Sequence, residues 1–156
     1  MSQSRRESVA DWLMILGAAG LFGSLFLTWS HQFSAAFLAQ FAASGALHGV
    51  PRDPTAWQLY SVADGLLALL AVAVVAVALR GGRSRRLVVM LGLTIALAFT
   101  LHALSHPPTN GANLFAPSLS VPGDSANAPS AGFGETVAIT GLGLAIVGLG
   151  LSLTVD

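Results

Sequence analysis

The chain has 156 residues, enough for one domain, and 54% of them are hydrophobic while only 9% are charged. A soluble domain carries about a quarter charged residues, so this composition excludes an ordinary water-soluble surface and indicates lipid as the natural solvent. The seven basic and seven acidic residues cancel, which leaves no electrostatic basis for binding nucleic acid. The absence of cysteine excludes disulfides and thiolate metal sites.

Four apolar stretches each approach the roughly 20 residues that a helix needs to cross the hydrocarbon core of a bilayer. Tryptophan, tyrosine and arginine mark their ends, as they do at membrane interfaces. For the first stretch we favour a retained anchor over a cleaved signal peptide, because its apolar run exceeds the usual length of about 7–15 residues. The sequence predicts an all-α integral membrane protein with transmembrane helices at 11–30, 57–79, 87–106 and 133–154, joined by loops at 31–56, 80–86 and 107–132.

The placement of arginine predicts how the chain is oriented. Arg5 and Arg6 precede the first span, four more arginines lie within 80–86, and only Arg52 lies on the other side. Cytoplasmic loops carry the excess of basic residues. We therefore expect an up-down-up-down four-helix bundle in a bacterial cell membrane, with both termini and the link 80–86 in the cytoplasm and the two longer loops outside.

The two outer loops differ in character. Residues 31–56 contain Phe33, Phe37 and Phe41 at a spacing of four, which gives one apolar helical face. We expect either a short helix on the outer leaflet or an extension of the first span, and this face is a candidate surface for a partner. Residues 107–132 contain five prolines, so regular structure is not expected there.

Small residues predict how the spans pack, because helices in lipid associate through close contact between small side chains. Gly17 and Gly20 give the first span one such face. This pattern predicts a tight bundle and requires no channel. The fourth span carries a continuous stripe on one face, at spacings of four, three, four, three and four: Gly134, Ala138, Gly141, Ala145, Gly148 and Ser152.

Asp64 is the first candidate for a functional residue, because a carboxylate inside a span is costly unless it faces the bundle and finds a partner or is protonated. Ser61 lies one turn earlier on the same side. His102, on a stripe with Thr94 and Ala98, is the expected partner, since the second and third spans are antiparallel neighbours and the two residues fall within about one turn in depth. We predict a hydrogen bond between Asp64 and His102, which either fixes helix register or handles protons or a ligand.

A weaker hypothesis concerns metal binding at the outer surface. His102 and His106 are four residues apart, a spacing that puts two imidazoles on one helix face. With Asp64 or Glu135 they could hold zinc or copper, although this spacing is common by chance. The first loop contributes two further histidines, His31 and His48.

The remaining charged residues have simpler interpretations. Glu135 begins the fourth span, where Thr136 and the free N–H groups of a helix start can satisfy a carboxylate, so a helix-start role is predicted. Arg52 and Asp53 are expected to form a solvated pair. There is no phosphate-binding glycine loop, no nucleophile beside a base and no paired carboxylates, so neither an enzyme nor a cofactor is expected.

Several short motifs resemble those of a group of small four-span membrane proteins from high-GC Gram-positive bacteria. They are FLTW at 26–29, WQLY at 57–60, DGLL at 64–67 and HPP at 106–108. In that group a Pro-Trp-Tyr-like motif follows the first span, and TWS at 28–30 departs from it. The resemblance covers the layout of the whole chain but implies no activity. The layout is also similar to claudin-like proteins, whose paired loop cysteines are missing here.

We therefore expect a non-enzymatic structural or accessory membrane protein that associates, within the lipid bilayer, with itself or with another membrane protein. The surfaces expected to make this association are the face of Phe33, Phe37 and Phe41 and any small-residue stripe that is not packed inside the bundle. One alternative is a small transporter or channel component with a protonatable site at Asp64 and His102. Another is a metal-binding protein at the outer face.

Overall fold

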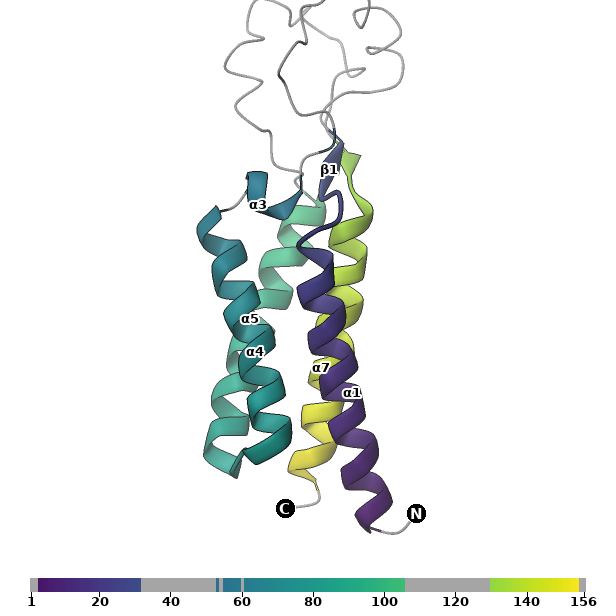
Figure 1. Cartoon of the computed structure of the whole chain (residues 1–156), viewed down its shortest axis with the longest axis vertical. Helices are drawn as coiled ribbons and strands as arrows, with labels where there is room; N and C mark the ends of the chain where they lie inside the picture. Colours follow the sequence, from purple (N-terminus) through teal and green to yellow (C-terminus); the bar gives the residue numbers. More distant parts are fainter. Residues whose placement is uncertain (1–2, 32–52, 54, 60, 106–129, 155–156) are drawn as a thin grey trace, which may run out of the picture.

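The structure, a computed structural model, describes residues 3–31, 53, 55–59, 61–105 and 130–154. Four long helices lie side by side, with both chain termini at one end (Figure 1). We call the opposite end, where α1 ends and α7 begins, the distal end. In chain order the elements are α1 (Gln3–Ser24), β1 (Ser30–His31), α3 (Ala56–Leu59), α4 (Ser61–Arg80), α5 (Arg83–Ser105), β2 (Ser130–Ala131) and α7 (Phe133–Leu153).

Among the described residues, α4, α5 and α7 are helices long and apolar enough to cross a membrane. This agrees with the predicted all-α, multi-pass membrane protein. Helix α1 differs from the predicted span at 11–30, because it begins at Gln3 and ends at Ser24. The chain leaves the helix through tight turns, in which the amides of Leu25 and Phe26 bond to carbonyls three residues back. The apolar residues after Ser24 therefore lie outside the helix.

Two other predicted boundaries need correction. The span predicted at 57–79 is divided into the short helix α3 and the long helix α4. Helix α3 starts with a reciprocal pair, in which the Thr55 amide donates to the Gln58 side chain at 3.0 Å and the Gln58 amide donates to the Thr55 carbonyl at 3.1 Å. Helix α5 begins at Arg83 rather than at 87, because the link after α4 is only Gly81–Gly82.

The segment after α1 is tied to the start of α7 at the distal end. Strands β1 and β2 pair antiparallel, which places regular structure at the end of the loop predicted at 107–132. Beyond β2, the Gly132 amide donates to the Trp29 carbonyl at 2.8 Å and the Gly134 amide donates to the Thr28 carbonyl at 2.7 Å. Thr28 also forms a β-bridge with Thr55. This junction joins parts of the chain that are far apart in sequence.

The four long helices form a ring in which neighbours run antiparallel. Helix α1 packs most extensively on α7 and also contacts α4, while α5 contacts α7 and α4 (Figure 1). At the end with the termini, the Arg86 side chain donates to the Ser152 carbonyl at 3.3 Å and joins α5 to α7. The core between the helices is apolar, and its largest fully buried aliphatic side chains are Met14, Leu21, Leu25, Val74, Leu93, Leu142 and Leu149.

Glycine permits a close approach of the backbones of α1 and α7. A Cβ on Gly17 would lie 2.5 Å from the backbone nitrogen of Ala145, and a Cβ on Gly141 would lie 2.6 Å from that of Leu21. Gly20 faces Gly141, and Gly148 lies against the backbone of Ala10 and Met14. The small-residue stripe of α7 therefore packs on the glycine face of α1, backbone against backbone.

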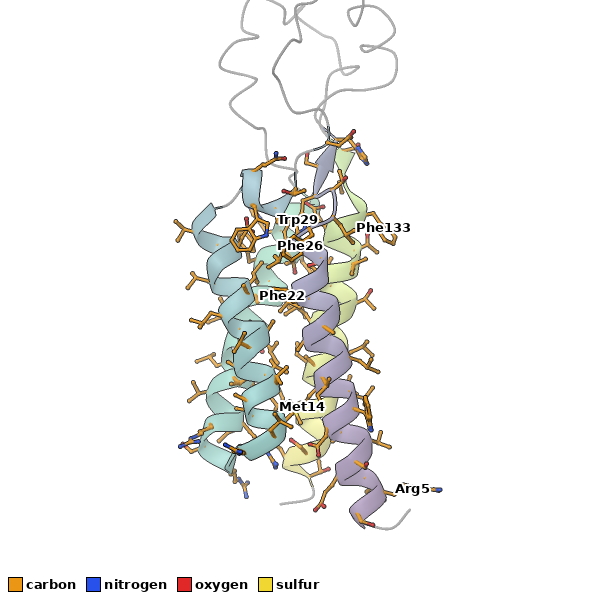
Figure 2. The ribbon with its side chains drawn as sticks, viewed as in Figure 1. Arg5, Met14, Phe22, Phe26, Trp29 and Phe133 are labelled. Carbon is orange, nitrogen blue, oxygen red and sulfur yellow. The ribbon has the colours of Figure 1, made fainter. Side chains whose placement is uncertain are left out.

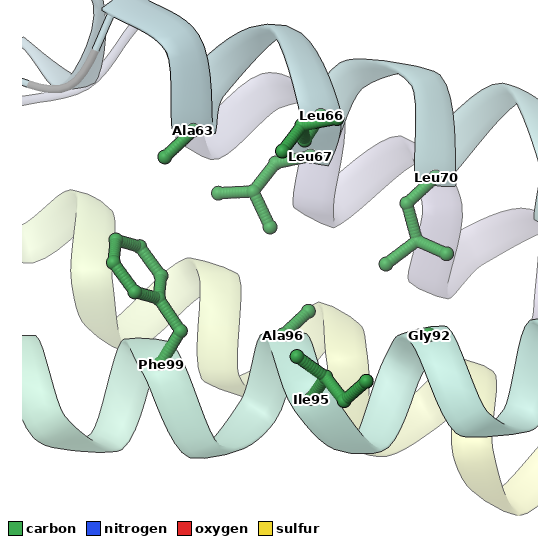
Figure 3. A pocket seen from close by; sticks show the side chains of 8 residues that line it. All are labelled: Ala63, Leu66, Leu67, Leu70, Gly92, Ile95, Ala96 and Phe99. Carbon is green, nitrogen blue, oxygen red and sulfur yellow. The ribbon is translucent and has the colours of Figure 1, made fainter.

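The pair α4 and α5 is packed less closely. An apolar hollow of about 330 Å³ lies between them, and Figure 3 shows its lining side chains facing one another from the two helices. At its floor, a Cβ on Gly92 would meet only the end of the Leu70 side chain, at 3.1 Å. The lining residues are Ala63, Leu66, Leu67, Leu70, Gly92, Ile95, Ala96 and Phe99.

Candidate functional site

Asp64 lies on the buried face of α4, close to the distal end. It shares this face with Leu67, Ala71 and Val74, at helical spacings of three and four. Its side chain is 0% exposed, and neither carboxyl oxygen has a hydrogen-bond partner within the described part of the chain. A buried polar group without a partner costs free energy, so Asp64 is a strong candidate for a functional residue.

The predicted hydrogen bond between Asp64 and His102 is wrong. His102 is exposed on α5, and so are Thr94 and Ala98, which were expected to share its inward face. The buried face of α5 instead carries Thr100, and a difference of two residues is a rotation of about 200° around a helix. The third member of the predicted site, Ser61, begins α4, but its side chain is outside the described residues.

Thr100 is the buried polar residue of α5 that the sequence interpretation missed. It is 0% exposed, and its hydroxyl donates to the helix's own carbonyls at Ala96, at 3.1 Å, and Leu97, at 3.0 Å. The signal was present in the sequence, because Leu93, Ala96, Thr100 and Ala103 follow at spacings of four and three, and all four are buried.

Glu135 does not take the predicted helix-start role. It is 0% exposed, and both of its carboxyl oxygens lack a hydrogen-bond partner among the described residues. No side chain caps the start of α7 at Gly132. The carbonyls of Thr28 and Trp29 already accept hydrogen bonds from the amides of Gly134 and Gly132, so the preceding chain occupies the helix start. Glu135 is therefore a second buried carboxyl without a partner.

Trp29 covers the distal end of the bundle beside the start of α7. Figure 2 shows it at the distal end, on the segment that follows α1. Its ring is fully buried, and the indole N–H donates to the Ser24 carbonyl at 2.8 Å. The ring also packs against Gly134, where any Cβ would collide with the indole. Ser24 is itself fully buried, and its hydroxyl donates to the Leu21 carbonyl at 2.6 Å.

The histidines do not form a metal site within the part of the chain that the structure describes, which holds no suitable group of three or more histidines and carboxylates. His102 faces outward, whereas Glu135 is buried. His31 pairs with Asp53 through Nδ1 and Oδ1 at 2.6 Å, and both are exposed. The predicted pair of Arg52 with Asp53 is not described, because Arg52 lies outside the described residues. So do the remaining residues of the metal and partner hypotheses: His48, His106, Phe33, Phe37 and Phe41.

The distal half of the bundle thus contains one fully buried polar side chain from each long helix: Ser24, Asp64, Thr100 and Glu135. Comparison with protein-family models, curated proteins and solved structures gives no match to this chain. The function is therefore argued from the geometry of the chain.

Proposed function

We propose that the chain crosses the bacterial plasma membrane four times, through α1 as well as α4, α5 and α7, with both termini in the cytoplasm. Helix α1 lies along α7, which is itself apolar enough to span (Figure 1). Arg5 and Arg6 on α1 lie at the same end as Arg80 and Arg83, which flank the link between α4 and α5. Basic residues gathered at one end favour that end as the cytoplasmic side.

This topology predicts the labelling of single cysteines, which are informative because the natural chain has none. Ser130→Cys, at the distal end, should react with a membrane-impermeant maleimide added to intact cells. Ser84→Cys, at the start of α5, should react only after the membrane is opened. Both serines are exposed, so access to the reagent depends on the side of the membrane. The reverse labelling pattern would contradict the orientation.

We propose further that the protein is a non-enzymatic structural or accessory membrane protein that associates with itself or with another membrane protein. The observation that supports this is a second small-residue stripe on α7, which faces away from the bundle. Thr136 and Thr140 are exposed on it, and a Cβ on Gly143 or Gly150 would meet no atom within 4 Å. Val147, a larger residue that is 54% exposed, lies on the same stripe.

The outward stripe and the stripe that packs on α1 lie on opposite faces of α7. Gly141 contacts the backbone of α1, whereas a Cβ on Gly143, about 200° further round the helix, would meet no atom within 4 Å. A hollow of about 250 Å³ lies beside the outward stripe, between α1 and α7, and it is lined by Thr136, Thr140 and neighbouring apolar residues. Small residues allow close approach of another helix in lipid, so this face suits association.

Replacing Gly143 by leucine should weaken association about tenfold, a loss of about 1.4 kcal/mol. The leucine would hold an approaching helix away from α7, while the added Cβ meets no atom of the same chain. The fold should be unharmed, since leucine favours helix more than glycine does. Analytical ultracentrifugation or native mass spectrometry in mild detergent measures the assembly.

The matched control for this experiment is Gly65→Leu. Gly65 likewise lies on a long helix and has open space at its Cβ, but it is exposed where Gly143 is half-buried, and it lies on α4 rather than on α7. The control should leave the assembly unchanged. A wild-type protein that purifies as a lone monomer, or an assembly equally sensitive to both substitutions, would contradict association through α7.

A second candidate function, a small transporter or channel component, is supported by the buried carboxyls. Ionisable residues inside membrane bundles usually serve ion or proton pathways. The residues concerned are Asp64 and Glu135, and not Asp64 and His102. Asp64→Asn should abolish flux if the protein transports ions, and should leave assembly unchanged if the protein is only a structural subunit.

A further inference from the structure

Each of the four long helices contributes one fully buried polar side chain to the distal half of the bundle, in addition to Ser30 on β1. The four are the hydroxyls of Ser24 on α1 and Thr100 on α5, and the carboxyls of Asp64 on α4 and Glu135 on α7. Most other fully buried side chains in the described core are apolar. Such a set is costly to bury unless its polar atoms are satisfied.

The first pair is at a similar depth in α4 and α5. Ala63 and Phe99 line the hollow between these helices and face each other at one end of it (Figure 3). Asp64 and Thr100 follow them in sequence; because the two helices run antiparallel, these residues lie within about 3 Å of each other in depth, at 1.5 Å per residue. The hollow itself is apolar, and the two polar side chains turn away from it to the buried faces of their helices.

The second pair is at a common depth in α1 and α7. Gly20 and Gly141 touch, since a Cβ on Gly20 would lie 3.4 Å from the Cα of Gly141. From that contact towards the distal end, Ser24 is about 6 Å along α1 and Glu135 is about 9 Å along α7, at 1.5 Å per residue. The two side chains therefore lie within about one helical turn of each other in depth.

The contact between α5 and α7 relates the depth of the first pair to the depth of the second. The Arg86 side chain bonds to the Ser152 carbonyl near the termini. Towards the distal end, Thr100 lies about 21 Å along α5 from Arg86, and Glu135 lies about 26 Å along α7 from Ser152. Each of the four side chains is fully buried, and at 1.5 Å per residue they lie at similar depths in their helices; we call these four residues the buried polar layer.

The hydrogen bonding of this layer favours a cation. The hydroxyl protons of Ser24 and Thr100 are donated to carbonyls of their own helices, so the hydroxyl oxygens keep lone pairs to offer. The carboxyl oxygens of Asp64 and Glu135 have no partner within the described residues. A cation satisfies several oxygens at once and neutralises their charge.

We propose that the distal half of the bundle holds a buried site for a hard cation, with Asp64 and Glu135 as charged ligands and the hydroxyls of Ser24 and Thr100 as neutral ligands. Oxygen donors select Ca²⁺, Mg²⁺ or Na⁺ over softer metals. Two carboxylates balance one divalent ion, and one carboxylate with one protonated carboxyl balances Na⁺. Trp29, packed against Gly134 and bonded to Ser24, closes this layer on the distal side.

The test is thermal unfolding of the full chain in detergent, after chelation, in choline chloride. CaCl₂, MgCl₂ and NaCl are then added separately. At least one of them should raise the Tm of the wild type by several degrees, because a ligand that binds only the folded state stabilises it. The identity of the effective salt distinguishes divalent from monovalent binding. No shift with any of the three salts would overturn the proposal.

Variants assign the effect to the site. Asp64→Asn and Glu135→Gln keep side-chain shape and should each abolish the shift, whereas Glu7→Gln, at an exposed carboxylate near the N-terminus, should keep it. If either buried variant does not fold, Thr100→Val removes one neutral ligand and should reduce cation affinity several-fold. A shift retained in all the site variants would overturn the proposal, as would a Tm that responds to pH but to none of the salts.

Discussion

Replacing Gly141 by alanine should disrupt the pairing of α1 with α7 and destabilise the protein by about 3 kcal/mol, the upper end of the usual range for overpacking. The added methyl would lie 2.6 Å from the Leu21 nitrogen and 2.8 Å from the Gly17 oxygen. Both are backbone atoms, so no side-chain rotation relieves the collision and one helix must move. Unfolding in SDS, followed by circular dichroism, measures the loss.

The control is the same substitution two residues further along α7. Gly143→Ala changes helix propensity by the same amount, and its methyl group meets no atom within 4 Å. This variant should be neutral or more stable by up to about 1 kcal/mol, because alanine favours helix over glycine. Equal stability of the two variants would show that the close approach of α1 to α7 does not hold the bundle together.

Replacing Trp29 by alanine should cost about 3–5 kcal/mol, the range for removing a large buried aromatic side chain. The substitution removes a ring that is 0% exposed, the hydrogen bond to Ser24 and the packing against Gly134. It also opens the layer that contains Glu135 to solvent. The same SDS titration measures the change in the free energy of unfolding.

Trp12 provides the control for this substitution. It lies on α1 and is 62% exposed, so Trp12→Ala removes a side chain that faces away from the core. Its effect should fall within about 1 kcal/mol, as for most exposed positions. A loss of stability as large as that of Trp29→Ala would mean that tryptophan contributes through the membrane interface rather than through burial at the distal end.

The sequence predicted the packing of α7 better than that of α5, for a physical reason. Gly141 and Gly148 belong to a periodic run of small residues. Close helix contact in lipid needs small residues, so the pattern seen in the sequence is itself what permits the contact. On α5 the predicted inward face follows His102, because a histidine can bond to the carboxylate of Asp64. Small and apolar neighbours mark the buried face more reliably, and they lie with Thr100.

Other features depend on parts of the chain that local sequence does not relate to one another. Glu135 occupies a position where a carboxylate often bonds to free backbone amides, but those at Gly132 and Gly134 bond to carbonyls about 100 residues earlier in the chain. No local pattern predicts that contact. The end of α1 at Ser24 is a similar case, because residues 25–29 are apolar enough to continue a span yet leave the helix to build the distal junction.

The close contact between α1 and α7 joins the earliest and the latest of the four long helices that the structure describes. In the four-span topology proposed above, α1 is made before the other three, and its glycine face pairs with α7 only once α7 has been made. The hairpin of α4 and α5 has only a two-glycine link and can pair early, because closing a short loop costs less entropy. The final step of assembly is then the docking of α7, which completes the helix pair and the distal junction together. The order of biogenesis, and the interval in which an incomplete chain is vulnerable to misassembly, therefore follow from which two helices carry the matching glycines.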